Sequence, residues 1–244
     1  MTPSSSSAQN VFATTRWSLV QAAGGGDSAA ARAALETLCQ NYWAPIYAFV
    51  RRFGHRPEDA EDLTQEFFQR LLERNYPGKA DPRKGRFRTF LLIALNHFLL
   101  DQRARQNAQK RGGGKALISF DSATEEERLA LEPLDELTPE AIFERRWAGS
   151  ILGEAEHRLR VEFEAGGQAP EWQVLQHFLP GEQGSLNYAD AAARLGMTEN
   201  TFKSKVHRMR QRHRELVHAT VAETVATPAE VEAELRHLIA LLAG

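Results

Sequence analysis

The stretch Leu186–Leu216, LNYADAAARLGMTENTFKSKVHRMRQRHREL, predicts two helices that meet at a tight turn. Gly196 stands where the first helix would end, a position that favours a residue able to adopt positive φ. Thr198 follows as an N-cap for the second helix. That helix has apolar residues at helical spacing, namely Phe202, Val206 and Met209, and basic side chains over much of its remaining surface. This pattern is typical of a helix-turn-helix, whose second helix enters the DNA major groove.

A plain helical hairpin with a solvated basic face would also fit the charge run, because exposed charges usually serve solubility. The turn chemistry and the one-sided charge agree with each other, which favours DNA binding. The motif alone does not distinguish a repressor, an activator or an initiation factor.

Length and composition indicate an ordinary globular chain. Its 244 residues suit one or two domains, and 42% hydrophobic with 25% charged residues is typical of a soluble protein. No apolar run is long enough to cross a bilayer, so no membrane insertion is expected. The first residues, MTPSSSSAQN, lack the layout of a secretory signal. Cys39 is the single cysteine, so neither an intrachain disulfide nor a Cys-rich zinc site is possible. We expect a cytoplasmic protein.

The net charge of −2 is unusual for a DNA-binding protein, but the charges are segregated. Basic residues collect in 86–111 and 203–214, while acidic residues collect in 121–144. Contact with phosphate depends on the local field, so the two basic segments are candidate nucleic-acid surfaces.

Helical periodicity predicts an all-α first domain at about residues 12–111. We expect a short helix at 12–20 and a long one at 29–53, kinked or split at Pro45. Helices at 58–74 and 86–109 follow, the former with Pro57 at its start. These four segments can bury one core.

The rest of the chain predicts a linker, a second all-α domain and a tail. Residues 112–138 are Gly-rich and then acidic, as in a flexible linker. The second domain is expected at 139–218, broken at Gly166 and Gly167. In the tail, 219–244, Thr227 is placed to cap a helix whose apolar stripe runs from Val231 to Leu242. We expect that stripe to pack on the second domain and mask it from DNA.

No catalytic constellation is visible. The histidines are scattered without metal-ligand spacing, no phosphate-binding loop is present, and nothing marks a partner for Cys39 as a nucleophile. We therefore expect no enzymatic activity, no metal and no cofactor. His213, between Arg212 and Arg214, fits better as a neighbour of DNA phosphate than as a ligand.

Two basic helical surfaces in separate α-domains suggest two kinds of nucleic-acid contact. The helix-turn-helix suits duplex DNA, and the helix after Arg86 combines arginines with aromatic and amide groups that suit unstacked bases. A protein that holds duplex with one domain and melted strand with the other has a layout for opening promoters.

Three motifs in this order resemble the bacterial RNA polymerase sigma factors of the extracytoplasmic-function type, within the sigma-70 family. DAEDLTQEFFQRLL (Asp59–Leu72) is similar to the family's polymerase-clamp helix. FRTFLLIALNHFLLDQRARQ (Phe87–Gln106) is similar to its promoter −10 helix. The helix-turn-helix is similar to its −35 reader. The resemblance covers about residues 30–111 and 140–216. It implies a sigma domain 2-like four-helix domain, a sigma domain 4-like domain and a C-terminal helical extension.

The resemblance implies a role for each motif. A core-polymerase surface would bind the β′ clamp, through Asp59, Asp62, Gln65, Glu66 and Arg70. A −10 surface would contact melted DNA, through Asn96, Asp101, Arg103 and Arg105. A −35 surface would contact the major groove and its phosphates, through Thr198, Asn200, Thr201, Lys203, Ser204, His207 and Arg208.

The implied partners are core RNA polymerase (β′ clamp and β flap) and promoter DNA, both duplex and melted. An anti-sigma factor or a kinase remains open as a regulator, with Thr64 inside the clamp motif as an acceptor or simply a surface threonine. One departure is Leu95, which stands before Asn96 where the family often has arginine. The alternative function is a conventional dimeric regulator that binds a palindromic operator.

Overall fold

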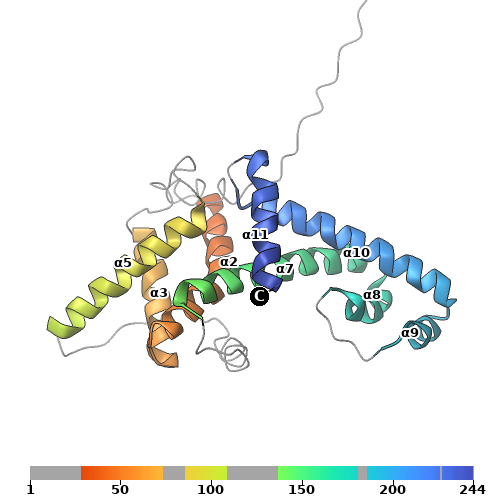
Figure 1. Cartoon of the computed structure of the whole chain (residues 1–244), viewed down its shortest axis with the longest axis horizontal. Helices are drawn as coiled ribbons and strands as arrows, with labels where there is room; N and C mark the ends of the chain where they lie inside the picture. The colour runs from red at the N-terminus through yellow and green to blue at the C-terminus, as the bar shows by residue number, and fades with distance from the viewer. Residues whose placement is uncertain (1–28, 74–85, 109–136, 181–185, 226, 244) are drawn as a thin grey trace, which may run out of the picture.

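The structure, a computed structural model, describes residues 29–73, 86–108, 137–180, 186–225 and 227–243. Every regular element in these ranges is a helix, which confirms the all-α prediction. The molecule is elongated, with α5 towards one end, α9 towards the other, and α11 crossing α7 near the middle (Figure 1). The predicted helix at 12–20 and almost all of the predicted linker lie outside the described residues.

The first core is built from α2 (Ala29–Arg52), α3 (Pro57–Glu73) and α5 (Phe87–Ala108). The α2 helix contains Pro45 and continues past it, so the expected split is not found. Pro57 is the first residue of α3, as predicted. Aromatic edges join the three helices: Tyr42 meets Phe87 at 5.5 Å between ring centroids, and Phe67 meets Phe98 at 5.6 Å.

The α7 helix (Pro139–Ala165) belongs to two cores. Thr138 caps it by accepting a hydrogen bond from the backbone N–H of Ala141 at 3.2 Å. The first half of α7 packs against α2, through Ile142, Phe143, Trp147, Ala148 and Ile151. Its second half contributes Ala155 and Leu159 to a separate cluster. One continuous helix therefore connects the two apolar clusters.

The second core combines the end of α7 with α8 (Ala169–Leu175), the 3₁₀ turn η3 (Gln176–Phe178), α9 (Tyr188–Arg194) and α10 (Glu199–Ala222). The break predicted after α7 is present, with Gly166 at the C-cap and Gly167 at φ +71°. The large apolar members of this core include Trp172, Leu175 and Phe202, all at most 2% exposed. These residues fix α10 against α7, α8 and α9.

The chain ends in η4 (Pro228–Glu230) and α11 (Val231–Ala243). Thr227 occupies the N-cap position as predicted, but its side chain makes no capping hydrogen bond. Val231 and Leu238 are buried together with the end of α10 and with the first core, and α11 packs on both α7 and α10. The apolar stripe is therefore only partly packed, since Ile239 is 63% and Leu242 47% exposed. The division into domains at residue 139 stays a prediction, since the first half of α7 shares its core with α2.

Candidate polymerase and nucleic-acid interfaces

The turn before α10 has the backbone that the sequence predicts. Gly196 has φ +63°, in the left-handed region that favours glycine. Thr198 caps α10: its hydroxyl accepts a hydrogen bond from the N–H of Thr201 at 3.3 Å. The turn therefore sets the angle at which the start of α10 projects from the molecule.

The start of α10 presents its polar residues to solvent. All seven residues of the predicted −35 surface are exposed: Thr198, Asn200, Thr201, Lys203, Ser204, His207 and Arg208. The opposite side of the same turns is buried, with Phe202 0%, Val206 2% and Met209 2% exposed. Phe202 packs edge-on against Phe178 at 5.0 Å and against Tyr188 at 5.9 Å. An aromatic cluster thus anchors the helix while its polar face stays open. The prediction that the C-terminal helix masks this face is wrong, because α11 leaves it exposed.

Several basic residues of α10 already have partners. Lys203 Nζ lies 2.6 Å from Glu199 Oε1, and Lys205 Nζ lies 2.6 Å from Glu171 Oε2 on α8. Arg212 pairs with Glu162 of α7 at 2.7 Å and with Glu215 at 2.8 Å. Among the described residues, Arg208 is an exposed cation of this helix with no such ion pair. It is therefore better placed to contact phosphate than Arg212.

His213 is buried, at 7% exposure, and its pKa is lowered because burial penalises the charged imidazole. The interpretation of His213 as a phosphate neighbour is therefore wrong. The flanking Arg212 and Arg214 are exposed, so the sequence context of the histidine pointed to the wrong face of the helix.

The predicted polymerase surface lies along α3. Asp59 and Asp62 are exposed, while Gln65, Glu66 and Arg70 are half-buried. Arg70 Nη2 pairs with Glu66 Oε1 at 3.2 Å, and its guanidinium lies over the ring of Phe98 at 4.9 Å. Acidic residues in the first turn also suit the helix dipole. The exposed end of this surface is anionic and suits a basic partner.

Thr64 lies within the same segment but on its inner side. It is fully buried, and its hydroxyl donates to the carbonyl of Ala60 at 2.7 Å. The interpretation of Thr64 as a surface threonine is therefore wrong, and a kinase has no access to its hydroxyl in this arrangement.

The predicted −10 surface lies towards the end of α5. Asp101, Arg103 and Arg105 are exposed and Asn96 is half-buried. Leu95 is fully buried, so this position faces the core. An arginine there would place its charge in the core. The pKa of His55 is lowered, chiefly by burial. The charge of Asp59 raises this pKa and the charge of Arg103 lowers it, so both side chains lie near the imidazole. The −10 and polymerase surfaces are therefore neighbours.

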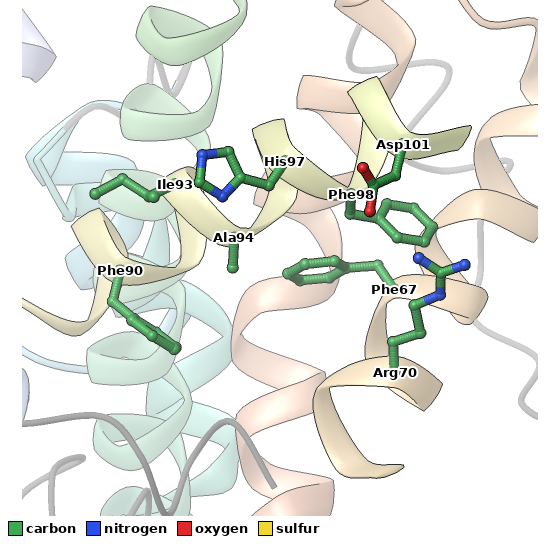
Figure 2. A pocket seen from close by; sticks show the side chains of 8 residues that line it. All are labelled: Phe67, Arg70, Phe90, Ile93, Ala94, His97, Phe98 and Asp101. Carbon is green, nitrogen blue, oxygen red and sulfur yellow. The ribbon is translucent and has the colours of Figure 1, made fainter. Parts of the chain in front are cut away.

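A pocket of about 170 Å³ lies between α3 and α5 (Figure 2). Phe67 and Phe98 project into it between the helices, and Arg70 and Asp101 stand beside Phe98 at one end. The remaining lining residues come from α5 and are Phe90, Ile93, Ala94 and His97. Arg70, predicted for polymerase, and Asp101, predicted for DNA, thus share one pocket. Ile93 is 54% exposed, and no sequence signal marks it as a site residue, because isoleucine in an apolar helix is ordinarily a core residue.

The start of α5 differs from expectation. The basic segment that begins at Arg86 was expected to face nucleic acid, but Arg88 is 4% exposed and pairs with Glu144 of α7 and Glu234 of α11. Burial lowers the pKa of the Arg88 guanidinium, and Glu144 opposes that shift. Arg88 is therefore a structural cation, because side chains remote in sequence neutralise it.

Two further features concern metal ions and membranes. Among the described residues, no group of three or more His, Cys, Asp or Glu side chains is placed to hold a metal ion. No helix in the described ranges combines the length and apolar character needed to span a bilayer.

Comparisons with known proteins point to one family. Residues 38–109 match the family model described as Sigma-70 region 2, which covers α3, α5 and most of α2. The chain is 28% identical over 202 residues to the ECF RNA polymerase sigma factor SigE of Mycolicibacterium smegmatis, an alignment that covers 82% of this chain and 67% of the relative. No solved structure matches the chain. The matched segment contains the α3 and α5 surfaces described above, and both comparisons support a sigma factor of the sigma-70 family, of the extracytoplasmic-function type.

Proposed function

We propose that this sigma factor directs core RNA polymerase to promoters by using three surfaces: the acidic face of α3 for polymerase, the neighbouring end of α5 for the −10 element, and the start of α10 for the −35 element. The observation that carries the proposal is the placement of the two DNA surfaces towards opposite ends of an elongated molecule (Figure 1). Two contacts separated along one duplex suit a promoter reader. No catalytic step of its own is assigned to the chain.

The −35 surface has the geometry of major-groove readers. Residues at the N-terminal end of a recognition helix reach base edges, and later cations lie on phosphates. Asn200, Thr201 and Lys203 are exposed in the first turns, and Arg208 is exposed two turns further on. We therefore assign base contacts to the first group and a phosphate contact to Arg208.

The pocket between α3 and α5 suits an unstacked base near the −10 element. Aromatic walls from Phe67 and Phe98 can pack on a base, and Arg70 and Asp101 offer a donor and an acceptor at the same end (Figure 2). Capture of such a base would favour the melted state without any input of ATP. The exposed cations Arg103 and Arg105 would hold the adjoining backbone.

The acidic face of α3 supports the assignment to the β′ clamp, because complementary charge steers association. Asp59 and Asp62 supply the exposed anionic groups. Contact of the second core with the β flap, and control by an anti-sigma factor, rest on the family resemblance.

The test is promoter-specific runoff transcription with purified core polymerase. The wild-type chain should give discrete transcripts, whereas the double variant Asp59→Lys, Asp62→Lys should lose at least about tenfold in association with core. Glu73→Lys reverses a charge at the other end of α3 and should change little, since the described part of the chain offers its carboxylate a hydrogen bond from Gln69 of the same helix and no ion pair. A chain that binds promoter duplex but never associates with core would overturn the proposal.

The alternative of a dimeric operator-binding regulator predicts symmetric half-sites and no polymerase contact. A footprint separates the two functions, because a sigma factor gives two unlike patches at promoter spacing. The family match favours the sigma factor and gives no support to the alternative.

A further inference from the structure

The boundary between the two cores falls inside α7. Ile151 is the last α7 residue of the first core, and Ala155 is the first α7 residue of the second. Gly153 lies within that boundary, and Gly149 lies two residues before Ile151 in the same helix. Glycine is among the least favourable residues in a helix interior, so the junction is the part of α7 that is easiest to bend or unwind.

Packing does not explain these glycines. A Cβ atom at Gly149 or Gly153 would meet nothing within 4 Å, and both residues are exposed. Between them, the hydroxyl of Ser150 donates to the carbonyl of Arg146 at 3.0 Å, a back-bonding arrangement that often accompanies bends in helices. The arrangement seen here would accommodate alanine at both positions, so the glycines point to a second arrangement in which α7 is not straight.

A cluster of charged side chains lies on the first-core side of this boundary. Glu234 of α11 is fully buried, and its carboxylate faces Arg86 Nε at 3.0 Å and the guanidinium of Arg88 as ion pairs. Arg88 Nε also lies 2.8 Å from Glu144 Oε2 of α7, and His237 Nε2 of α11 lies 3.0 Å from the same oxygen. Arg88 further lies over the ring of Trp147 at 4.3 Å. The cluster therefore joins α11 to α5 and to the first half of α7.

The chain that leaves the second core returns to the first core before it reaches α11. Leu216 of α10 packs in the second core, whereas Val221 and Val225, just after it, pack in the first. The end of α10 and α11 thus reach back from the helix-turn-helix across the junction (Figure 1). Any rotation of the second core about Gly149–Gly153 has to pull this segment away from α5.

We propose that Gly149–Gly153 is a hinge in α7 and that α11 is a strap that holds the hinge straight by fastening Glu234 to Arg86 and Arg88. Buried ion clusters add specificity of arrangement more than stability, because their desolvation offsets their attraction. The strap therefore selects one relative placement of the two cores. Because its net contribution to stability is small, contacts with a partner can compensate for its release.

The biological role of the hinge rests on the proposed function, whereas the hinge itself does not. With the strap fastened, the −10 and −35 surfaces are held at one spacing. With the strap released, α7 bends and the helix-turn-helix changes its distance and angle relative to α5. Core polymerase and promoter would then select the arrangement that fits both elements.

The test measures the distance between the two ends of the chain by pulsed electron paramagnetic resonance, without polymerase or DNA. Spin labels are placed on the exposed sites Ala104→Cys and Ala193→Cys, in a background where the buried Cys39 is replaced as Cys39→Ala. The otherwise unaltered chain should give one narrow distance distribution. Glu234→Gln, which cuts the strap, should at least double its width.

The second arm stiffens the hinge. Adding Gly149→Ala and Gly153→Ala to the strap variant should return the width to that of the unaltered chain, because alanine fits at both sites and favours helix. Val161→Ala is the matched control: Val161 is exposed on the same helix, away from the junction, and its replacement should leave the distribution broad.

Two outcomes would overturn the proposal: an unchanged narrow distribution in the strap variant, or equal narrowing by Val161→Ala. If Glu234→Gln fails to fold because Arg88 loses a buried partner, Arg86→Gln decides, since the Arg86 side chain is 35% exposed and its loss leaves the Arg88–Glu144 pair in place. Runoff transcription by the unaltered chain is a separate measurement, so a failed hinge and a failed sigma-factor assignment give different results.

Discussion

Arg158 of α7 and Glu223 at the end of α10 form a two-pronged ion pair, with Nη1 2.7 Å from Oε1 and Nη2 2.8 Å from Oε2. The pKa of Arg158 is raised, chiefly by its hydrogen bonds to Glu223, with a further contribution from Glu154. Arg158 also donates to Glu154 at 2.8 Å. The pair fastens the second half of α7 to the end of the recognition helix.

Replacing Glu223 by glutamine should therefore destabilise the fold. The carboxylate is 10% exposed and the guanidinium 32%, so we expect a loss of about 1–2 kcal/mol, less than for a fully buried pair. Urea unfolding of Glu223→Gln measures it. The matched control is Glu164→Gln, whose pair with Arg160 is 3.7 Å long and half exposed and should contribute below about 0.5 kcal/mol. Equal effects at the two sites would contradict the importance of the Arg158–Glu223 geometry.

Arg208→Ala should weaken binding to promoter duplex and reduce the dependence of log K on log salt by about one, because one phosphate contact and its counterions are lost. Fluorescence anisotropy at several salt concentrations gives the slope. Arg212→Ala is the control: this arginine is also exposed but already paired with Glu162 and Glu215, so its loss should leave the slope unchanged. A reversed result would move the phosphate contact to Arg212.

Thr198→Ala should lower the free energy of unfolding by about 1 kcal/mol, because the N–H of Thr201 loses its acceptor at the helix start. Thermal unfolding monitored by circular dichroism measures the change. Thr227→Ala removes the same hydroxyl from another N-cap position where it makes no capping hydrogen bond, and it should be close to neutral. A neutral Thr198→Ala would mean that water replaces the cap at no cost.

Acid should destabilise the fold through His213. Its pKa is lowered in the folded chain, so below about pH 6.5 the unfolded chain binds more protons than the folded chain. The contribution of His213 to the free energy of unfolding is constant above that pH. It falls as the pH drops towards the pKa of His213 in the folded chain. His213→Gln should flatten this slope, whereas His157→Gln, at an exposed position of α7, should not. Urea unfolding between pH 5 and pH 8 tests both variants; parallel curves for wild type and His213→Gln would contradict the assignment. The lowered pKa of His55 adds a slope of the same sign.

Local signals predicted much of the helix-turn-helix. The glycine at 196 and the threonine cap at 198 act within a few residues, so their conformations follow from backbone preference and short hydrogen bonds. The apolar spacing of Phe202 and Val206 likewise identified the inner side of α10. The contacts of the exposed residues with polymerase and DNA remain predictions.

Arg88, Thr64 and His213 were misplaced for a common reason. Each is polar and lies near the edge of an apolar stripe, where helical periodicity alone does not decide which way it faces. Arg88 is buried because Glu144 and Glu234 approach from helices distant in sequence. Thr64 is buried because its hydroxyl bonds to its own helix, and His213 because a neutral imidazole tolerates an apolar environment. The pairings of Arg88 with residues so distant in sequence leave no local signature.

The shared membership of α7 has a practical consequence for anyone who isolates the helix-turn-helix. A fragment cut at Pro139 would carry Phe143 and Trp147 into water, although both are fully covered in the intact chain. Such a fragment would expose a hydrophobic aromatic strip and would self-associate at the concentrations used for spectroscopy. Starting the fragment beyond Gly153 would remove the strip, at the expense of the helix turns that precede Ala155.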